Sequence, residues 1–290
     1  MGKNFAWIVL KDIHGDGKKM DIENFSDLWS DSKKSYNMEE KFWDERADEF
    51  NEKDMEEKEN EEFFSILEFI EAGKNKKFNT VLDIGCGTGF YSKRFSEISR
   101  SVTAVDISES MLKYAEENSG TKYNNVSFVK KAWSELNLDE FGWRKKFDMV
   151  FASMTPAIDS YKDLIKMMDC GTNLYFLSGF VEKKDSLKSG LSEVILGCHD
   201  DGFYKNKIYS AFNILWNMGY YPKISYVDSD WTESRPAGKC YKKYLLYFER
   251  KKSLTKKDKV SIKEYIEAMS VNGMVEEKVT SKVAWLCWKK

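Results

Sequence analysis

The stretch VLDIGCGTGFYSKRF, residues 81–95, decides the fold of this chain. A short apolar run, residues 81–84, leads into three glycines at every second position, and a helix-like segment, residues 90–98, follows. Glycine lets the backbone turn and approach a ligand without a side chain in the way. The unpaired N–H groups at the start of the helix point into the same space. The stretch therefore predicts a strand, a ligand-binding loop and a helix at the carboxyl edge of an open α/β sheet.

Strands and helices alternate on the carboxyl side of this stretch. Apolar runs predict seven strands, at residues 81–84, 102–106, 126–129, 147–152, 174–177, 224–227 and 279–288. Apolar residues at helical spacing predict helices at residues 90–98, 108–118, 158–168 and 208–218. Strands that alternate with helices of this length form βαβ units, so the chain is predicted to be an α/β protein with a mostly parallel, doubly wound sheet.

The flanking regions have a different pattern. Residues 38–51 are predicted to be a helix, residues 181–207 show no clear period, and residues 240–248 and 260–269 are predicted to be two more helices. The expected segments are an N-terminal extension of uncertain origin (residues 1–37), N-terminal helices (38–74), a ligand-binding core (75–180), and the rest of the sheet with insertions (181–290). Met20 is an alternative start, because residues 1–19 fit no later pattern.

Composition excludes several classes of protein. The apolar fraction of 42% suits a folded chain, and a net charge of -2 provides no basic field for nucleic acid. The five cysteines form no CxxC pair, so we expect no metal site, no disulfide framework and a reducing, cytoplasmic location. No apolar run approaches the roughly 20 residues that cross a bilayer, so we expect no membrane partner.

The glycine loop resembles motif I, (D/E)xGxGxG, of the class I S-adenosylmethionine-dependent methyltransferases. Asp83 supplies its acid, and Asp106, at the end of the next predicted strand, stands where the family has the acid that accepts hydrogen bonds from the ribose of the cofactor. The third glycine comes one residue sooner than in the GxGxxG loop of dinucleotide enzymes. The resemblance implies a Rossmann-like seven-stranded sheet with an antiparallel last strand, and S-adenosyl-L-methionine as the cofactor.

The resemblance extends to other positions. Trp43, Ala47 and Phe50 are similar to the lid helix of small-molecule methyltransferases related to ubiquinone biosynthesis, and they imply an N-terminal helical lid. Ala132 replaces the acid that the family often has beside the adenine, and Trp133 follows it. The expected cofactor-binding residues are Asp83, Gly85, Cys86, Gly87, Thr88, Gly89, Asp106, Ile107, Met111, Ala132, Trp133 and Ser153, and the expected substrate or lid residues are Trp43, Phe50, Met154 and Thr155.

The sequence thus predicts transfer of a methyl group to a small-molecule acceptor, with the C-terminal helices forming a cap beside that acceptor. A protein or nucleic acid acceptor, or a module that binds the cofactor without turnover, remains open. No catalytic residue is assigned, and His199 is a weak candidate. One or two of the aromatic residues in the C-terminal half are expected to face the acceptor, among Tyr204, Tyr209, Trp216, Tyr220, Tyr221, Trp231, Tyr241 and Tyr244.

Overall fold

The computed structural model describes residues 21–29, 35–53, 58–72, 77–120, 123–198 and 204–290 of the 290-residue chain. Its centre is an eight-stranded sheet with the strand order β3-β2-β1-β4-β5-β8-β6, and β7 also pairs with β8. Strands β1 to β5 pair in parallel, whereas β8 runs antiparallel to β5, β6 and β7. The strands are β1 Phe78–Ile84, β2 Ser99–Asp106, β3 Val126–Lys130, β4 Phe147–Ala152, β5 Gly171–Asp185, β6 Lys223–Asp228, β7 Trp231–Pro236 and β8 Met274–Lys289.

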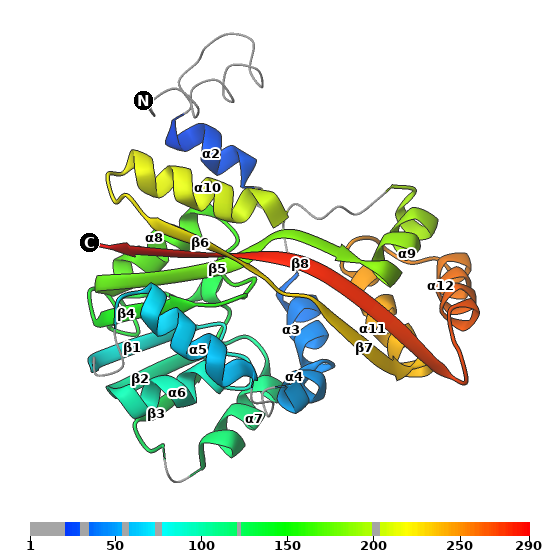
Figure 1. The fold of residues 1–290 in the computed structure, drawn as a ribbon, viewed down its shortest axis with the longest axis horizontal. Helices are drawn as coiled ribbons and strands as arrows, with labels where there is room; N and C mark the ends of the chain where they lie inside the picture. Colours follow the sequence, from blue (N-terminus) through cyan, green and yellow to red (C-terminus); the bar gives the residue numbers. More distant parts are fainter. Residues whose placement is uncertain (1–20, 30–34, 54–57, 73–76, 121–122, 199–203) are drawn as a thin grey trace.

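Helices cover both faces of this sheet (Figure 1). On one face, α8 (Tyr161–Cys170) and α10 (Tyr204–Asn217) pack against the strands, and α2 (Ile22–Leu28) packs on α10. On the other face, α5 (Lys58–Phe69) and α6 (Phe90–Ile98) bury Ile66 and Phe95. The central strands are apolar on both faces because both faces are covered, as expected for a parallel sheet.

Strands β5 and β8 continue beyond the carboxyl edge of the other parallel strands. Residues 180–185 of β5, residues 274–283 of β8 and β7 form a three-stranded extension, which we call the distal ribbon. Helices α9 (Ser186–Leu196), α11 (Ala237–Glu249) and α12 (Lys256–Ala268) pack at its end around their own buried cluster. Figure 1 shows these three helices set apart from the core, with the red strand β8 running through both parts.

The N-terminal lid consists of two short helices above the carboxyl edge. Helix α3 (Tyr36–Asp44) and helix α4 (Ala47–Lys53) both pack against α7 (Glu109–Ser119). Asp44 fixes this contact because its Oδ1 accepts hydrogen bonds from the hydroxyl of Ser108 at 2.6 Å and the amide of Ser110 at 3.0 Å.

The predicted fold class is confirmed, including the antiparallel last strand and the helical insertion before it. Three expectations were wrong in detail. The helix predicted at residues 38–51 is broken into α3 and α4, the sheet has eight strands instead of seven, and residues 181–207 contain the end of β5 and helix α9. The four proposed segments remain a prediction. None of the helices within the described ranges is long and apolar enough to cross a membrane.

Candidate functional site

A cavity of about 840 Å³ opens at the carboxyl ends of β1, β2 and β4, beneath the lid. It brings together nearly all of the residues that the sequence predicts for the cofactor, the acceptor and the lid. The predicted residues that line it are Trp43, Phe50, Gly85, Cys86, Gly87, Thr88, Asp106, Ile107, Met111, Ala132, Trp133, Ser153, Met154 and Thr155. Asp83 and Gly89 are not among the lining residues. A volume of this size falls within the range of small-molecule sites.

The glycine loop has the backbone that a ligand cradle needs. Gly85, Gly87 and Gly89 have φ angles of 69°, 54° and 85°, in the left-handed region that favours glycine. A Cβ on Gly87 would come near Met111 Sδ alone, at 4.0 Å, so a larger side chain there would extend into the cavity. A Cβ on Gly85 would instead lie 1.9 Å from Thr155 Oγ1, so this glycine permits the close approach of the β4 turn.

Asp106 presents its carboxylate at the wall of the cavity. Its Oδ2 accepts a hydrogen bond from the Gly87 amide, and its Oδ1 accepts one from the Ser108 amide, both at 2.9 Å. Burial raises the pKa of this carboxyl, although the backbone donors oppose the rise. A carboxylate has about four acceptor positions, so Asp106 keeps capacity to accept from a hydroxyl of a ligand.

Asp83 supports the loop from behind the cavity. It is buried, and the hydroxyl of Ser92 on α6 donates to its Oδ2 at 2.6 Å. Burial, with a smaller contribution from Asp106, raises the pKa of Asp83 to about 7. A carboxyl with this pKa changes its charge near neutral pH, beneath the loop.

The segment after β3 forms another wall of the cavity. Ala132 caps a short 3₁₀ helix, Trp133–Glu135, and the indole N–H of Trp133 donates to the Asp163 carbonyl at 3.3 Å. The ammonium of Lys166 donates to the carbonyls of Trp133 and Ser134 at 2.9 and 2.8 Å. The buried indole is therefore held in a fixed orientation.

The turn after β4 is strained and held by several contacts. Met154 has a φ of 50°, which is uncommon for a residue with a side chain. Its amide donates to the hydroxyl of Ser178 at 2.9 Å, and Lys207 donates to the Thr155 carbonyl at 2.7 Å. Strain of this kind, of order 1–3 kcal/mol, persists where surrounding contacts fix the backbone, and it is frequent at ligand sites.

The lid covers the cavity with aromatic rings. The rings of Trp43 and Phe50 meet edge to face with centroids 5.8 Å apart, and the guanidinium of Arg46 lies over both. The lid is tied to the distal helices because Arg250, at the end of α11, donates to both carboxylate oxygens of the buried Glu39, at 2.8 and 2.5 Å.

Some lining residues carry no sequence signal. Tyr36 and Glu39 come from α3, Glu62 from α5 and Tyr91 from α6, where the Tyr91 hydroxyl donates to Glu62 at 3.0 Å. They lie far apart in the sequence and form no motif. His199, the weak catalytic candidate, lies outside the described residues. Within the described ranges, no group of three or more His, Cys, Asp or Glu side chains could hold a metal ion.

Comparison with known proteins relates the central part of the chain to methyltransferases. Residues 75–178 match the family model of a methyltransferase domain. The chain is 33% identical to the ribosomal protein L11 methyltransferase of Thermotoga petrophila over 114 residues, which are 39% of this chain and 41% of that protein. It is 29% identical to malonyl-[acyl-carrier protein] O-methyltransferase 1 of Ilyobacter polytropus, over 38% of this chain and 41% of that protein. The matched region thus spans less than half the length of either relative.

Among solved structures, a putative methyltransferase from Bacillus halodurans aligns with a TM-score of 0.47 at 13% identity, covering 77% of this chain and 97% of that one. These two sequence relatives differ in the acceptors that their names give, and the family model covers the residues that contain the glycine loop and Asp106.

Proposed function

We propose that this chain, whose residues 75–178 form a class I S-adenosylmethionine-dependent methyltransferase domain, transfers a methyl group from S-adenosylmethionine to a small-molecule acceptor. One observation carries the proposal: the glycine loop, the Asp106 carboxylate and the strained turn after β4 line a single cavity beneath an aromatic lid. The resemblance stated from the sequence is confirmed by the domain match, and with it the cofactor.

The residues of the cavity fit this cofactor. Asp106 retains acceptor capacity for a ribose hydroxyl, and Gly87 leaves room for a ligand against the loop. Ile107 and Trp133 offer apolar surface to the adenine. The methyl group of the bound cofactor is already activated by its positively charged sulfur, so no protein nucleophile is required.

The remaining task of the protein is to align the acceptor and keep water out. Holding two reactants in line can supply several kcal/mol of the rate enhancement. The turn at residues 153–155 is rigid, and the rings of Trp43 and Phe50 close the opposite side. We assign no general base.

A small acceptor, in the cytoplasm, suits the covered cavity and the nearly balanced net charge of -2. The names of the relatives do not indicate a free small molecule as the acceptor, because one name gives a ribosomal protein and the other a malonyl group on an acyl-carrier protein. Both names favour an acceptor that is a protein or is carried by a protein.

The test uses methyl-labelled S-adenosylmethionine, the purified protein and an extract of its host divided by a size cut-off filter. Label in the small-molecule fraction is the expected result. Label retained with macromolecules and released by protease would instead support a protein acceptor. Absence of transfer in both fractions, with cofactor binding intact, would support a module that binds without turnover.

A further inference from the structure

A lysine on the distal ribbon lies among aromatic rings next to the lid. The ammonium of Lys183 is 4.7 Å from the ring centroid of Phe180 and 5.1 Å from that of Trp231. The side chain therefore folds back along β5, toward the carboxyl edge of the sheet. Phe180 follows Ser178, whose hydroxyl accepts from the Met154 amide at the cavity, by two residues, or roughly 7 Å along a strand.

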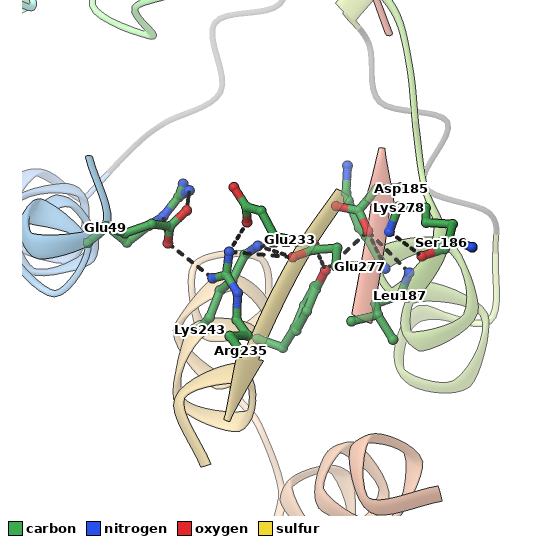
Figure 2. Close-up of polar contacts among 12 residues, drawn as sticks. Glu49, Asp185, Ser186, Leu187, Glu233, Arg235, Lys243, Glu277 and Lys278 are labelled. Carbon is green, nitrogen blue, oxygen red and sulfur yellow. Dashed lines mark hydrogen bonds and ion pairs between the residues drawn. The ribbon is translucent and has the colours of Figure 1, made fainter. Parts of the chain in front are cut away.

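Several charged groups beside Lys183 form ion pairs and hydrogen bonds with one another (Figure 2). The buried carboxylate of Glu277 accepts from Lys243 at 2.7 and 3.0 Å and also from the hydroxyl of Tyr244. Arg235 pairs with Glu49 on the lid helix α4 at 3.1 Å and with Glu233. These contacts form a network that joins β7, β8, α11 and α4, and it extends to Arg46 through Glu49 and to Asp185 through Tyr244.

Lys183 stands apart from this network. Of the residues in the described ranges, none places a carboxylate within ion-pair distance of its ammonium. The charged groups that act on it are Asp185 from the end of β5, Arg46 from between α3 and α4, Lys243 from α11 and Lys188 from α9. Burial, together with the three cations, lowers the pKa of Lys183 to about 8 against the opposing effect of Asp185.

Lys183, Phe180 and Trp231 are not among the residues that line the cavity, and their position relates to it through Arg46 and the lid. Arg46, which acts on Lys183, lies over the rings of Trp43 and Phe50, and both rings line the cavity. The two rings compensate a partly buried ammonium only in part, and an anionic oxygen would add a charge-assisted hydrogen bond.

We infer that Lys183 binds a carboxylate or phosphate group of the methyl acceptor, while Phe180 and Trp231 flank the adjoining part of that molecule. The inference rests on the proposed methyl transfer and adds to it a substrate class: an elongated acceptor whose anionic group lies away from the atom that is methylated. The product then keeps its negative charge.

Substitution of Lys183 tests the assignment. Lys183→Met keeps most of the side-chain volume but removes the charge, so kcat/KM for the acceptor should fall by about 10- to 100-fold, mainly through KM. Lys183→Arg, which keeps the charge, should retain most of the activity. Lys184→Met is the matched control, because Lys184 is the next residue of β5 and is exposed on the opposite face.

The pH profile separates binding from a structural role. Because a lysine is charged below its pKa, kcat/KM of the native enzyme should fall as the pH rises through about 8, the pKa of Lys183. Lys183→Arg should show no such fall, since arginine stays charged.

The deciding experiment passes the labelled small-molecule products of the host extract over an anion exchanger. The expected result is label that the exchanger retains, together with a lower kcat/KM in Lys183→Met but not in Lys184→Met. Label only in the unretained fraction overturns the anionic acceptor but leaves methyl transfer standing. Retained label with the same kcat/KM in Lys183→Met and Lys184→Met overturns the assignment of Lys183 to acceptor binding. Absence of label from every fraction contradicts the proposed function itself, and the inference falls with it.

Discussion

At the scale of single residues, the two acids that the sequence predicts for the cofactor, Asp83 and Asp106, differ in their surroundings. Asp106 lies at the cavity wall with two backbone donors, whereas Asp83 is buried behind the loop with one hydroxyl donor. The sequence predicts that both acids bind the cofactor, Asp83 within the glycine motif and Asp106 at the end of the next strand. Their positions indicate different roles, contact with the cofactor for Asp106 and support of the loop for Asp83.

Removal of the Asp106 carboxylate should weaken cofactor binding. Hydrogen bonds to a charged group contribute roughly 1.5–3 kcal/mol, so we expect Asp106→Ala to raise the Kd for S-adenosylmethionine by about 10- to 100-fold. Isothermal calorimetry measures this change. Glu264→Ala, at an exposed position of α12, should leave the Kd unaltered. An unchanged Kd for Asp106→Ala would remove this residue from the site.

The raised pKa of Asp83 should make folding stability depend on pH. Its pKa is about 7 in the folded chain against an ordinary value of 3.8, so the folded state binds more protons between these values. The free energy of unfolding should therefore fall as the pH rises from about 4 to 7, by at most about 4 kcal/mol from this group.

Asp83→Asn should abolish that part of the pH dependence and be more stable than the native chain at pH 8. Urea unfolding at pH 4.5 and pH 8 measures the difference. Asp228→Asn, on the exposed side of β6, is the control. Equal pH dependence in the native chain and in Asp83→Asn would contradict the assigned pKa.

The site could be predicted from the sequence wherever its residues are contiguous. The glycine loop, Asp106 and the turn at residues 153–155 each follow directly after an apolar run, so their place at the carboxyl edge can be deduced. Glu39, Glu62 and Tyr91 reach the cavity only through the packing of three different helices, and nothing in their local sequence indicates it.

At the scale of secondary-structure elements, the lid depends on contacts that are distant in sequence. Arg250 on α11 and Glu39 on α3 form a two-pronged ion pair, and the Arg250 guanidinium lies 4.1 Å from the ring centroid of Phe42. The distal helices therefore hold the lid in place, in addition to the contact of Asp44 with α7.

Loss of one partner of this ion pair should cost more than loss of both. Arg250→Met leaves the buried Glu39 carboxylate unpaired and should lower the free energy of unfolding by about 3 kcal/mol. The double variant Arg250→Met with Glu39→Leu should regain most of this loss. Urea unfolding gives the values, and Arg100→Met at an exposed position of β2 serves as the control. A double variant that loses the sum of both single effects would contradict a specific coupling between the two residues.

Local features explain why some elements could not be predicted from the sequence. Strand β7 reads WTESRP, with polar residues on both faces, because Glu233 and Arg235 point into the buried network and not into an apolar core. In α9, Leu187, Leu191 and Ile195 do recur at helical spacing, but Gly190 and the surrounding charges obscure the pattern. The long helix expected at residues 38–51 breaks between Asp44 and Ala47, and the guanidinium of Arg46 at this break lies over the ring of Phe50.

At the scale of the whole molecule, the core and the distal helices share two strands. β5 and β8 pair from Leu174 and Lys289 in the core to Asp185 and Val279 in the distal ribbon, with one bulge on the way. No flexible connection separates the two parts along these strands. We therefore expect them to unfold together.

Urea unfolding followed by tryptophan fluorescence and by far-ultraviolet circular dichroism should give coincident transitions. Hydrogen exchange should show similar protection at the Lys183 and Leu177 amides, because both belong to the same ladder. The Lys252→Met variant, which removes the hydrogen bonds of Lys252 to the Ile195 carbonyl and to Asp258 among the distal helices, should shift both probes equally. Two separated transitions would show that the distal helices fold independently.

The long strand β8 has a consequence for how the protein is made. It lies later in the chain than every other strand, yet it is the central partner of β5, β6 and β7. During synthesis the glycine loop and the lid leave the ribosome before β8. The backbone N–H and C=O groups at the edge of β5 therefore stay unpaired until β8 has been made. A chaperone that shields this edge would act in that interval. For the same reason, we expect an insertion in the connection between α11 and α12 to disturb folding less than one within β8, which pairs with strands of both the core and the distal ribbon.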